Sequence, residues 1–483
     1  MSTENKKLAV LYTNDVHSHF ENMPNIASAI RQLRDKHSRG ATLVVDCGDH
    51  MDRMRMETEG SGGRANVEVM NVTGYDAVVV GNNEGLTFVP AQLGEMYARH
   101  AKFAVLGTNV VEIDSGKRPS WMVPQLVVNK NGLSIGIIGV TIDFNTFYKM
   151  IGLQILDPFQ AVAEAVSQLR GRVDLIFVLS HLGLNKDREL ARRVEGIDGI
   201  FGGHTHHLLE KPLVENGTII CAAGYKGEFV GELVLEYDPA SGRIVHAEGT
   251  CHPISKFPED PGVLSVIDTF RQESARVLEQ KVTELKESLP IDWGGESVLG
   301  NLLADGIRDW TKADIGIVNA GQFVGGLNAG NITLRHLLEI CPSPINPCRM
   351  LLSGERIKVA LEEALLPEYK MMPIRGFGFR GKVLGSLCLS GIDVIYDPDK
   401  PPYQKIRSVL VGGKPLDLDA EYVVGTIDMF TFGIGYQSLK DGRNVRFFLP
   451  EFLRDILRER LSSRSIFQEA IVRSKQVHWT ASS

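Results

Sequence analysis

The sequence lacks the features that mark membrane proteins and nucleic-acid-binding proteins. No apolar run in its 483 residues approaches the roughly 18 residues that a membrane span requires. The N-terminal stretch MSTENKKLAV contains no apolar signal segment, so we expect a cytoplasmic protein with no membrane partner. The formal net charge of −7 provides no overall basic surface, which argues against nucleic acid as a partner.

Cysteine is scarce, and the sequence contains no internal repeat. The six cysteines are scattered and include no Cys-x-x-Cys pair, so we expect free thiols in a reducing compartment. They are Cys47, Cys221, Cys251, Cys341, Cys348 and Cys388. Hydrophobic residues make up 43% and charged residues 23%, which is typical of a globular protein. A chain of this length is too long for one core, so it predicts two domains.

The first apolar run ends in a pair of potential metal ligands. Residues 8–13 predict a buried strand, and the loop that follows presents Asp15 and His17. In extended backbone, residues two apart point the same way and lie about 6.6 Å apart along the chain. A carboxylate and an imidazole on one side suit Zn, Mn or Fe better than Ca or Mg. One such pair alone is more often an ordinary polar loop.

The same pattern recurs at four later strands. The predicted strands Ala41–Asp49, Asp76–Asn82, Asp174–His181 and Gly199–His204 all end in ligand-type residues. These residues are Asp49, Asn82, His181, His204 and, two residues on, His206. Strands that alternate with helices predict a layered α/β domain, in which ligands collect beyond the strand ends. The sequence therefore predicts a metal centre at one edge of the sheet structure.

Other patterns divide the chain into segments. Residues 1–260 are predicted to form the first domain, 261–287 a helical linker, and 288–483 a second domain. Asn131-Gly132 lies between two apolar runs and predicts a β-hairpin. The stretch Met51–Gly63 is rich in methionine, arginine and glycine, and we expect it to be a mobile loop.

Five sequence blocks at the predicted strand ends occur in a familiar order: TNDVH, CGD, GNNE, SHLG and GGHTH. The second domain adds GNLLADGIR, IVNAGQ, NAGNIT and LSGERIKVALE. Together they resemble the calcineurin-like metallophosphoesterases of the 5′-nucleotidase family, which includes UDP-sugar hydrolases and 2′,3′-cyclic phosphodiesterases. The resemblance implies a four-layer α-β-β-α domain followed by a smaller α/β substrate-binding domain.

The resemblance also implies two divalent metal ions, with Mn, Zn and Fe all open as their identity. Asp15, His17 and His206 would hold the first ion, Asn82, His181 and His204 the second, and Asp49 would bridge both. A water shared by two such metals becomes hydroxide near neutral pH and can attack phosphorus. The implied function is hydrolysis of phosphate esters, with nucleotides or related small phosphorylated metabolites as substrates.

The third block departs from the family pattern GNHEFD. The family histidine that contacts the phosphate is Asn83 here, and its aspartate partner is Leu86. Asn83 can donate a hydrogen bond at this catalytic position but cannot carry charge. The enzyme would then be slow, favour esters with good leaving groups, or use another cation; the candidates are Arg53, Arg55 and Arg64. The alternative is a catalytically attenuated protein that keeps the metal site and binds a small molecule or acts as a regulator.

The second domain departs from the family as well. The family's NGGGIR turn begins here at Asn319, and its substrate-binding arginine is replaced by Val324. One of the two aromatic rings that stack on a base in the family matches Tyr436, whereas the other position falls at Ser386. The segment RGFGFRG offers replacements for the lost charge and ring. Arg375 and Arg380 could replace the charge, and Phe377 or Phe379 could replace the ring. The other interpretation of this segment is a glycine-rich surface loop with solvated arginines.

Overall fold

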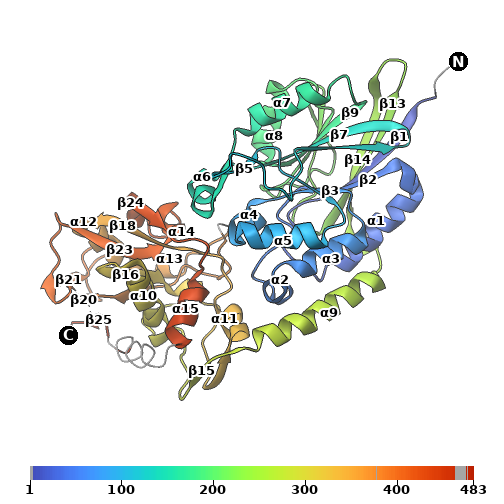
Figure 1. Cartoon of the computed structure of the whole chain (residues 1–483). Helices are drawn as coiled ribbons and strands as arrows, with labels where there is room; N and C mark the ends of the chain where they lie inside the picture. Colours follow the sequence, from blue (N-terminus) through green and yellow to red (C-terminus); the bar gives the residue numbers. More distant parts are fainter. Residues whose placement is uncertain (1–3, 377, 463–474, 476, 483) are drawn as a thin grey trace. The chain divides into compact units, whose positions relative to one another are not determined.

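The computed structural model describes residues 4–376, 378–462, 475 and 477–482, and it divides the chain into two compact units (Figure 1). The first unit is Met1–Ala275 and the second is Arg276–Ser483. This division falls inside the segment 261–287 that the sequence suggested as a linker.

The first unit contains two six-stranded sheets. The strands of the first sheet, in spatial order, are β14 (Arg243–Pro253), β13 (Phe229–Asp238), β1 (Lys6–Thr13), β2 (Thr42–Asp46), β3 (Ala77–Val79) and β4 (Ala104–Leu106). Those of the second are β11 (Leu213–Glu215), β12 (Thr218–Cys221), β10 (Gly199–Gly202), β9 (Leu175–His181), β7 (Leu133–Thr141) and β6 (Gln125–Lys130). A small pair, β5 (Val110–Glu112) and β8 (Leu153–Ile155), lies apart from both.

Helices cover the outer faces of the two sheets, and this makes four layers. They are α1 (Met23–His37), α2 (Met56–Ser61), α3 (Arg64–Thr73), α4 (Asn82–Thr87), α5 (Pro90–His100), α6 (Asn145–Tyr148), α7 (Pro158–Leu169), α8 (Leu184–Arg193) and α9 (Pro261–Leu278). One buried cluster joins the first sheet to α1, α3, α5 and α9, another joins the second sheet to α7 and α8, and a third fills the space between the sheets. The predicted α-β-β-α architecture is confirmed.

Parallel pairing explains why the strand ends meet at one edge. Strand β1 pairs parallel with β2, β2 with β3, and β9 with both β7 and β10. Helical crossovers return the chain to the same starting edge, so successive strands end together. The hairpin prediction is also confirmed, because β6 and β7 pair antiparallel around Asn131 (φ 52°) and Gly132 (φ 70°), as a type I′ turn requires.

Two segments differ from the sequence-based expectations. The stretch 51–63 contains helix α2, so it is not a loop throughout. The segment 261–287 is helical only to Leu278; residues Lys281–Leu285 form strand β15, which pairs with β17 (Gly330–Thr333). Helix α9 buries Val263, Ile267 and Phe270 in the first unit. Among the described residues, no helix combines the length and apolar character needed to cross a bilayer.

The second unit is built on a five-stranded and a four-stranded sheet. The first of these consists of β19 (Leu387–Ser390), β16 (Ile315–Asn319), β23 (Glu421–Ile427), β18 (Pro347–Ser353) and β24 (Arg443–Phe447). The other consists of β22 (Lys414–Pro415), β21 (Ile406–Val411), β20 (Ile392–Tyr396) and β25 (Trp479–Ala481). The helices are α10 (Val298–Thr311), α11 (Leu334–Ile340), α12 (Gly354–Ala364), α13 (Pro367–Lys370), α14 (Asp428–Thr431) and α15 (Leu453–Ser462).

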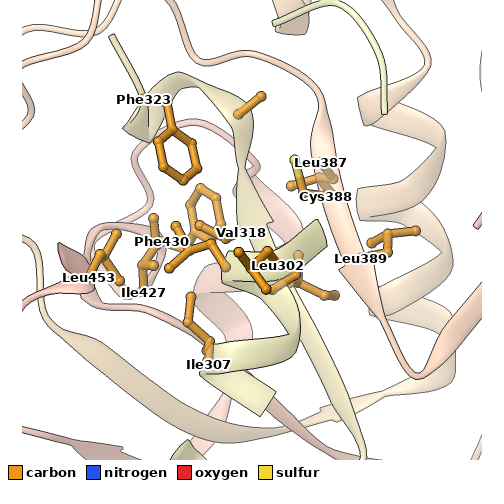
Figure 2. Close-up of a cluster of buried hydrophobic side chains, with 14 of the residues drawn as sticks. Leu302, Ile307, Val318, Phe323, Leu387, Cys388, Leu389, Ile427, Phe430 and Leu453 are labelled. Atoms are coloured by element: carbon orange, nitrogen blue, oxygen red, sulfur yellow. The ribbon is translucent and has the colours of Figure 1, made fainter. Parts of the chain in front are cut away.

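One apolar core holds the second unit together. Side chains from α10, β16, β19 and α15 meet in it, including Leu302, Val318, Leu389 and Leu453 (Figure 2). Cys388 lies in the same core, and all six cysteines of the chain are free. A separate core in each unit is what a chain of this length needs.

A buried carboxylate ties helix α1 to the edge strand β14 and to its neighbour β13 in the first sheet. Glu232, on β13, is 5% exposed and accepts hydrogen bonds from His37 Nε2 (2.6 Å) and His252 Nε2 (2.9 Å). Lys36 Nζ adds a third bond at 3.2 Å. Burial opposes ionisation, but these three partners outweigh it and lower the pKa of Glu232 to about 2.

Replacing Glu232 by Gln should lower the free energy of unfolding by about 2 kcal/mol at pH 7, because a buried charged partner is removed. The pKa of this carboxylate is lower in the folded protein than in the unfolded chain, where it is near 4.5. Its contribution to the free energy of unfolding is therefore complete above pH 4.5 and is lost as the pH falls toward 2. The difference from wild type should therefore shrink between pH 5 and about pH 3 in urea titrations. The matched control is Glu236→Gln, on the same strand as Glu232, which breaks a partly exposed ion pair with Lys7 of β1. A difference that stayed constant with pH would contradict the prediction.

Candidate metal centre

The ligand-type residues predicted from the sequence converge at the strand ends of the first unit. Asp15 and His17 follow β1, Asp49 follows β2, and Asn82 begins α4 after β3. In the second sheet His181 ends β9, and His204 and His206 follow β10. Six of these seven residues, all except Asn82, form two groups of potential metal ligands, in each of which the ligand atoms lie within 4.8 Å of one another. The groups are Asp15, His17 and His206, and Asp49, His181 and His204.

The two groups are adjacent, and Asp49 faces both. Its Oδ1 lies 3.2 Å from His181 Nε2, and its Oδ2 lies 3.8 Å from His17 Nε2. In the first group, His206 Nε2 lies 3.4 Å from both His17 Nε2 and Asp15 Oδ1. One carboxylate thus directs an oxygen toward each group, which is the arrangement of a ligand shared by two cations.

The fit of these residues to metal ions can be tested on the atoms around the second group. Asn82 Oδ1 is buried and has no hydrogen-bond partner among the described residues. Such an orphan oxygen is costly unless something binds it. His181 Nδ1 lies 2.7 Å from the carbonyl of Cys47; if Nδ1–H donates to it, the lone pair of Nε2 is directed at Asp49 and the centre. Imidazole nitrogens together with carboxylate and amide oxygens suit Zn, Mn and Fe, so the donor set fits.

The charges at the centre favour a bound cation. Burial lowers the pKa of His181, but the Asp49 carboxylate outweighs it and raises the pKa to about 10. Burial likewise opposes ionisation of Asp49, but the charge of His181 outweighs it and holds the pKa of Asp49 well below its usual range. Burial and the charge of His181 lower the pKa of His204 to about 4. A divalent ion would supply the positive charge that the His181 proton supplies and would release that proton.

Close backbone approach and left-handed backbone shape the centre. A β-carbon at Gly81 would lie 2.1 Å from Asp49 Oδ1, so only glycine fits beside that carboxylate. Five of the seven proposed ligands have positive φ angles between 48° and 72°. They are Asp15, His17, Asp49, His204 and His206. Non-glycine residues rarely adopt this conformation, and clusters of it occur at functional sites.

The sequence analysis missed Glu84, which fixes the loop that carries Asp49. Its carboxylate accepts hydrogen bonds from the backbone N–H groups of Asp49 (3.2 Å), His50 (2.5 Å), Met51 (3.1 Å) and Gly81 (3.1 Å). Burial, with the Asp49 charge added, raises the pKa of Glu84 to about 8. The available signal was the Gly81-x-x-Glu84 spacing, which is that of a helix N-terminal capping box.

Asn83 lies against the first group, as expected for its position in the third block. Its Nδ2 is 2.8 Å from His17 Nδ1, and its backbone N–H donates to Asp49 Oδ1 at 2.7 Å. The side chain is neutral, so it brings no positive charge to a phosphate. Asp52 Oδ2 lies 3.7 Å from the same His17 Nδ1, in the place of a residue that orients a metal ligand.

The three arginines proposed as substitute cations are engaged elsewhere. Arg53 forms a bidentate pair with Glu59 (2.7 and 2.9 Å) and donates to the Thr87 carbonyl. Arg64 lies over the ring of Phe270, 5.1 Å from its centroid. Arg55 forms an exposed ion pair with Glu21 at 2.8 Å. The first two side chains are therefore structural, and the charge of the third is compensated.

Two of the residues suggested for substrate binding in the second unit, Tyr436 and Asn319, are buried. Tyr436 is fully buried, stacks on Tyr369 with 5.7 Å between ring centroids, and donates its hydroxyl hydrogen to the Gly385 carbonyl. This corrects the expectation that Tyr436 stacks on a base, because the ring offers no face to a ligand. Asn319 is also buried, and its amide nitrogen donates to the Leu384 carbonyl.

The RGFGFRG segment is placed in part. Arg375 is exposed, Arg380 is half-buried with its backbone N–H donating to Ser343 Oγ, and Phe377 lies outside the described residues. Nothing in these contacts brings Arg375 and Arg380 together into a site. The two arginines remain predictions as substrate contacts.

Comparison with known proteins agrees with the fold and the centre. The calcineurin-like phosphoesterase family matches residues 8–208, and the 5′-nucleotidase C-terminal domain matches residues 279–441. The chain is 36% identical over 464 residues to the uncharacterised metallophosphoesterase YunD of Bacillus subtilis (strain 168), which covers 95% of this chain and 99% of that protein.

Two solved structures are similar in fold. They are the NAD nucleotidase NadN of Haemophilus influenzae (TM-score 0.70, 18% identity, 100% of both chains) and a 5′-nucleotidase precursor from Thermus thermophilus (TM-score 0.60, 24% identity, 98% of this chain and 99% of that one).

The fold and the centre define a hydrolase of phosphoric esters that depends on metal ions. The chain belongs to the calcineurin-like metallophosphoesterases, and its second unit is a 5′-nucleotidase C-terminal domain.

Proposed function

We propose that the chain uses two divalent metal ions to hydrolyse phosphate esters of nucleotides or related small phosphorylated metabolites. The observation that carries this proposal is the pair of adjacent ligand groups, with one Asp49 oxygen directed at each. Family membership supports it independently. When bound, two such ions would activate water and neutralise charge on the phosphoryl oxygens.

The residues of the chain have separate tasks in this proposal. Three hold the first ion, three hold the second, and Asp49 holds both. The first three are Asp15, His17 and His206, and the second three are Asn82, His181 and His204. Glu84 keeps the Asp49 loop in place, and the Cys47 carbonyl orients the His181 ring.

We also propose the finer features that fold and family leave open. Arg375 and Arg380 would contact the substrate from the second unit, where Val324 replaces the family arginine. A cytoplasmic location and a role in nucleotide breakdown are proposed as well; six free cysteines suit a reducing compartment.

Metal content measured by elemental analysis, beside a phosphate-release screen, tests the proposal. The screen would include bis-p-nitrophenyl phosphate, nucleotides and UDP-sugars, with Mn²⁺ or Zn²⁺ supplied. Two metal equivalents per chain together with turnover are expected. Two bound metals without turnover would favour the alternative of an attenuated small-molecule-binding protein, which the neutral Asn83 motivates. Absence of both metal and turnover would refute both interpretations.

A further inference from the structure

The centre lacks the positive side chain that its family places at position 83, and Arg53, Arg55 and Arg64 are engaged or compensated. A fourth cation, Lys226, is joined through its backbone to the residue Asp15 of the first ligand group. Lys226 belongs to the loop between β12 and β13. Unlike the three arginines, Lys226 is bonded through its backbone to Asp15, and its side chain forms no ion pair among the described residues.

The backbone of Lys226 is bound directly to the metal loop. Its N–H donates to the Asp15 carbonyl at 2.6 Å, and its own carbonyl accepts from Asn22 Nδ2 at 2.9 Å. The residue has a φ of 59°, which an L-residue rarely adopts. A lysine held in this conformation by two hydrogen bonds is positioned by the loop and is not simply a solvated surface residue.

The rest of the loop is fastened in the same way. Asn14 Nδ2 donates to the Gly224 carbonyl at 2.6 Å, and the Ala223 N–H donates to Asn14 Oδ1 at 2.8 Å. Asn14 immediately precedes the ligand Asp15. The loop that carries Lys226 therefore keeps its place relative to the first ligand group.

The side chain of Lys226 contacts an aromatic ring that itself stacks on one of the proposed ligands. Tyr225 stacks on the ligand His206, with 5.1 Å between centroids and 6° between planes. Lys226 Nζ lies 4.9 Å from the centroid of the same Tyr225 ring. Within the part of the chain that the structure describes, no carboxylate lies within 4.0 Å of this ammonium group, so its charge is not compensated by an ion pair.

We propose that Lys226 binds an anionic group of the substrate adjacent to the scissile phosphate, so that the preferred substrates carry a second phosphate. This inference rests on the proposed function, because it takes the two ligand groups as the place of the scissile phosphate. The ammonium contacts the ring of Tyr225, which stacks on His206, and in this proposal a neighbouring phosphate of the substrate meets it there. A flexible lysine serves as a point charge for phosphate.

Calorimetric titration of the Mn²⁺-loaded protein, freed of excess metal, tests this role without requiring turnover. The probes are inorganic pyrophosphate and orthophosphate, and the variants are Lys226→Met and Lys226→Arg. The Met variant should bind pyrophosphate about tenfold more weakly and orthophosphate less than about twofold more weakly. The Arg variant should retain pyrophosphate binding. Lys211→Met, which removes an exposed lysine of the same unit, should change neither affinity.

The assignment would be overturned if the Met variant lost affinity equally for both anions, or for neither. It would also be overturned if the wild-type protein bound pyrophosphate no better than orthophosphate. Elemental analysis of each variant checks that the metals are retained. If the selectivity depends on Lys226 but no ester is hydrolysed, the proposed function fails while the anion site stands. If esters are hydrolysed and the selectivity does not depend on Lys226, the reverse holds.

Discussion

Replacing Asp49 by Asn should remove both metal ions from the purified protein and lower phosphoester hydrolysis by more than about 10³-fold. The two oxygens of this carboxylate face different ligand groups, 3.2 Å from His181 and 3.8 Å from His17. An amide offers one neutral oxygen, so it cannot serve two cations. Elemental analysis measures the metals, and the rate with bis-p-nitrophenyl phosphate measures the loss.

The fold should survive this substitution. The hydrogen bond from the Asn83 N–H can be kept by an amide oxygen at position 49. His207→Ala is a suitable control, because His207 adjoins His206 but contacts Thr205 Oγ1 (2.9 Å) and belongs to neither ligand group. A variant of Asp49 that kept one metal and most of its activity would show that the carboxylate serves a single ion.

The double substitution Asn83→His with Leu86→Asp should raise the hydrolysis of nucleoside monophosphates by at least about 10²-fold. Both positions lie in helix α4, three residues apart, where side chains are neighbours on one face. Asn83 already lies 2.8 Å from a ligand histidine, so an imidazole there begins beside the centre. The gain should be greatest for poor leaving groups, because these depend most on a charged or proton-donating partner. The turnover number for each ester is the measurement.

The single variants separate the two contributions. Asn83→His alone should give a smaller gain, since nothing orients the ring. Leu86→Asp alone should give none and should lower stability, because Leu86 packs against the core of the first unit. If the double variant keeps its metals and gains no activity, the charge at position 83 does not limit the reaction. That result would favour the small-molecule-binding protein.

The convergence of the ligand-type residues could be predicted from the sequence because its signal is local. Each ligand follows an apolar run, and parallel strands in adjacent crossovers end at the same edge. Asp49, Asn82 and His181 could therefore be placed near one another without coordinates. The Asn131-Gly132 hairpin was predictable for a similar reason, since the turn chemistry is contained in two residues.

Other features depend on contacts between distant segments. Helix α2 is only six residues long and carries little periodicity. Strand β15 exists because it pairs with β17, about 50 residues later. Tyr436 is buried because it stacks on Tyr369, and no local sequence pattern predicts this contact. Lys226 is held in place by a backbone hydrogen bond to Asp15, more than 200 residues away in the chain. Tertiary packing decides such positions, and sequence patterns do not contain it.

The left-handed backbone at five of the proposed ligand positions has a cost in folding stability. Aspartate and histidine at such φ angles cost roughly 1 kcal/mol each relative to glycine, so the five residues together give up about 5 kcal/mol. These residues are Asp15, His17, Asp49, His204 and His206. The first unit is therefore strained where these side chains gather, and the packing of the rest of the unit has to supply the difference.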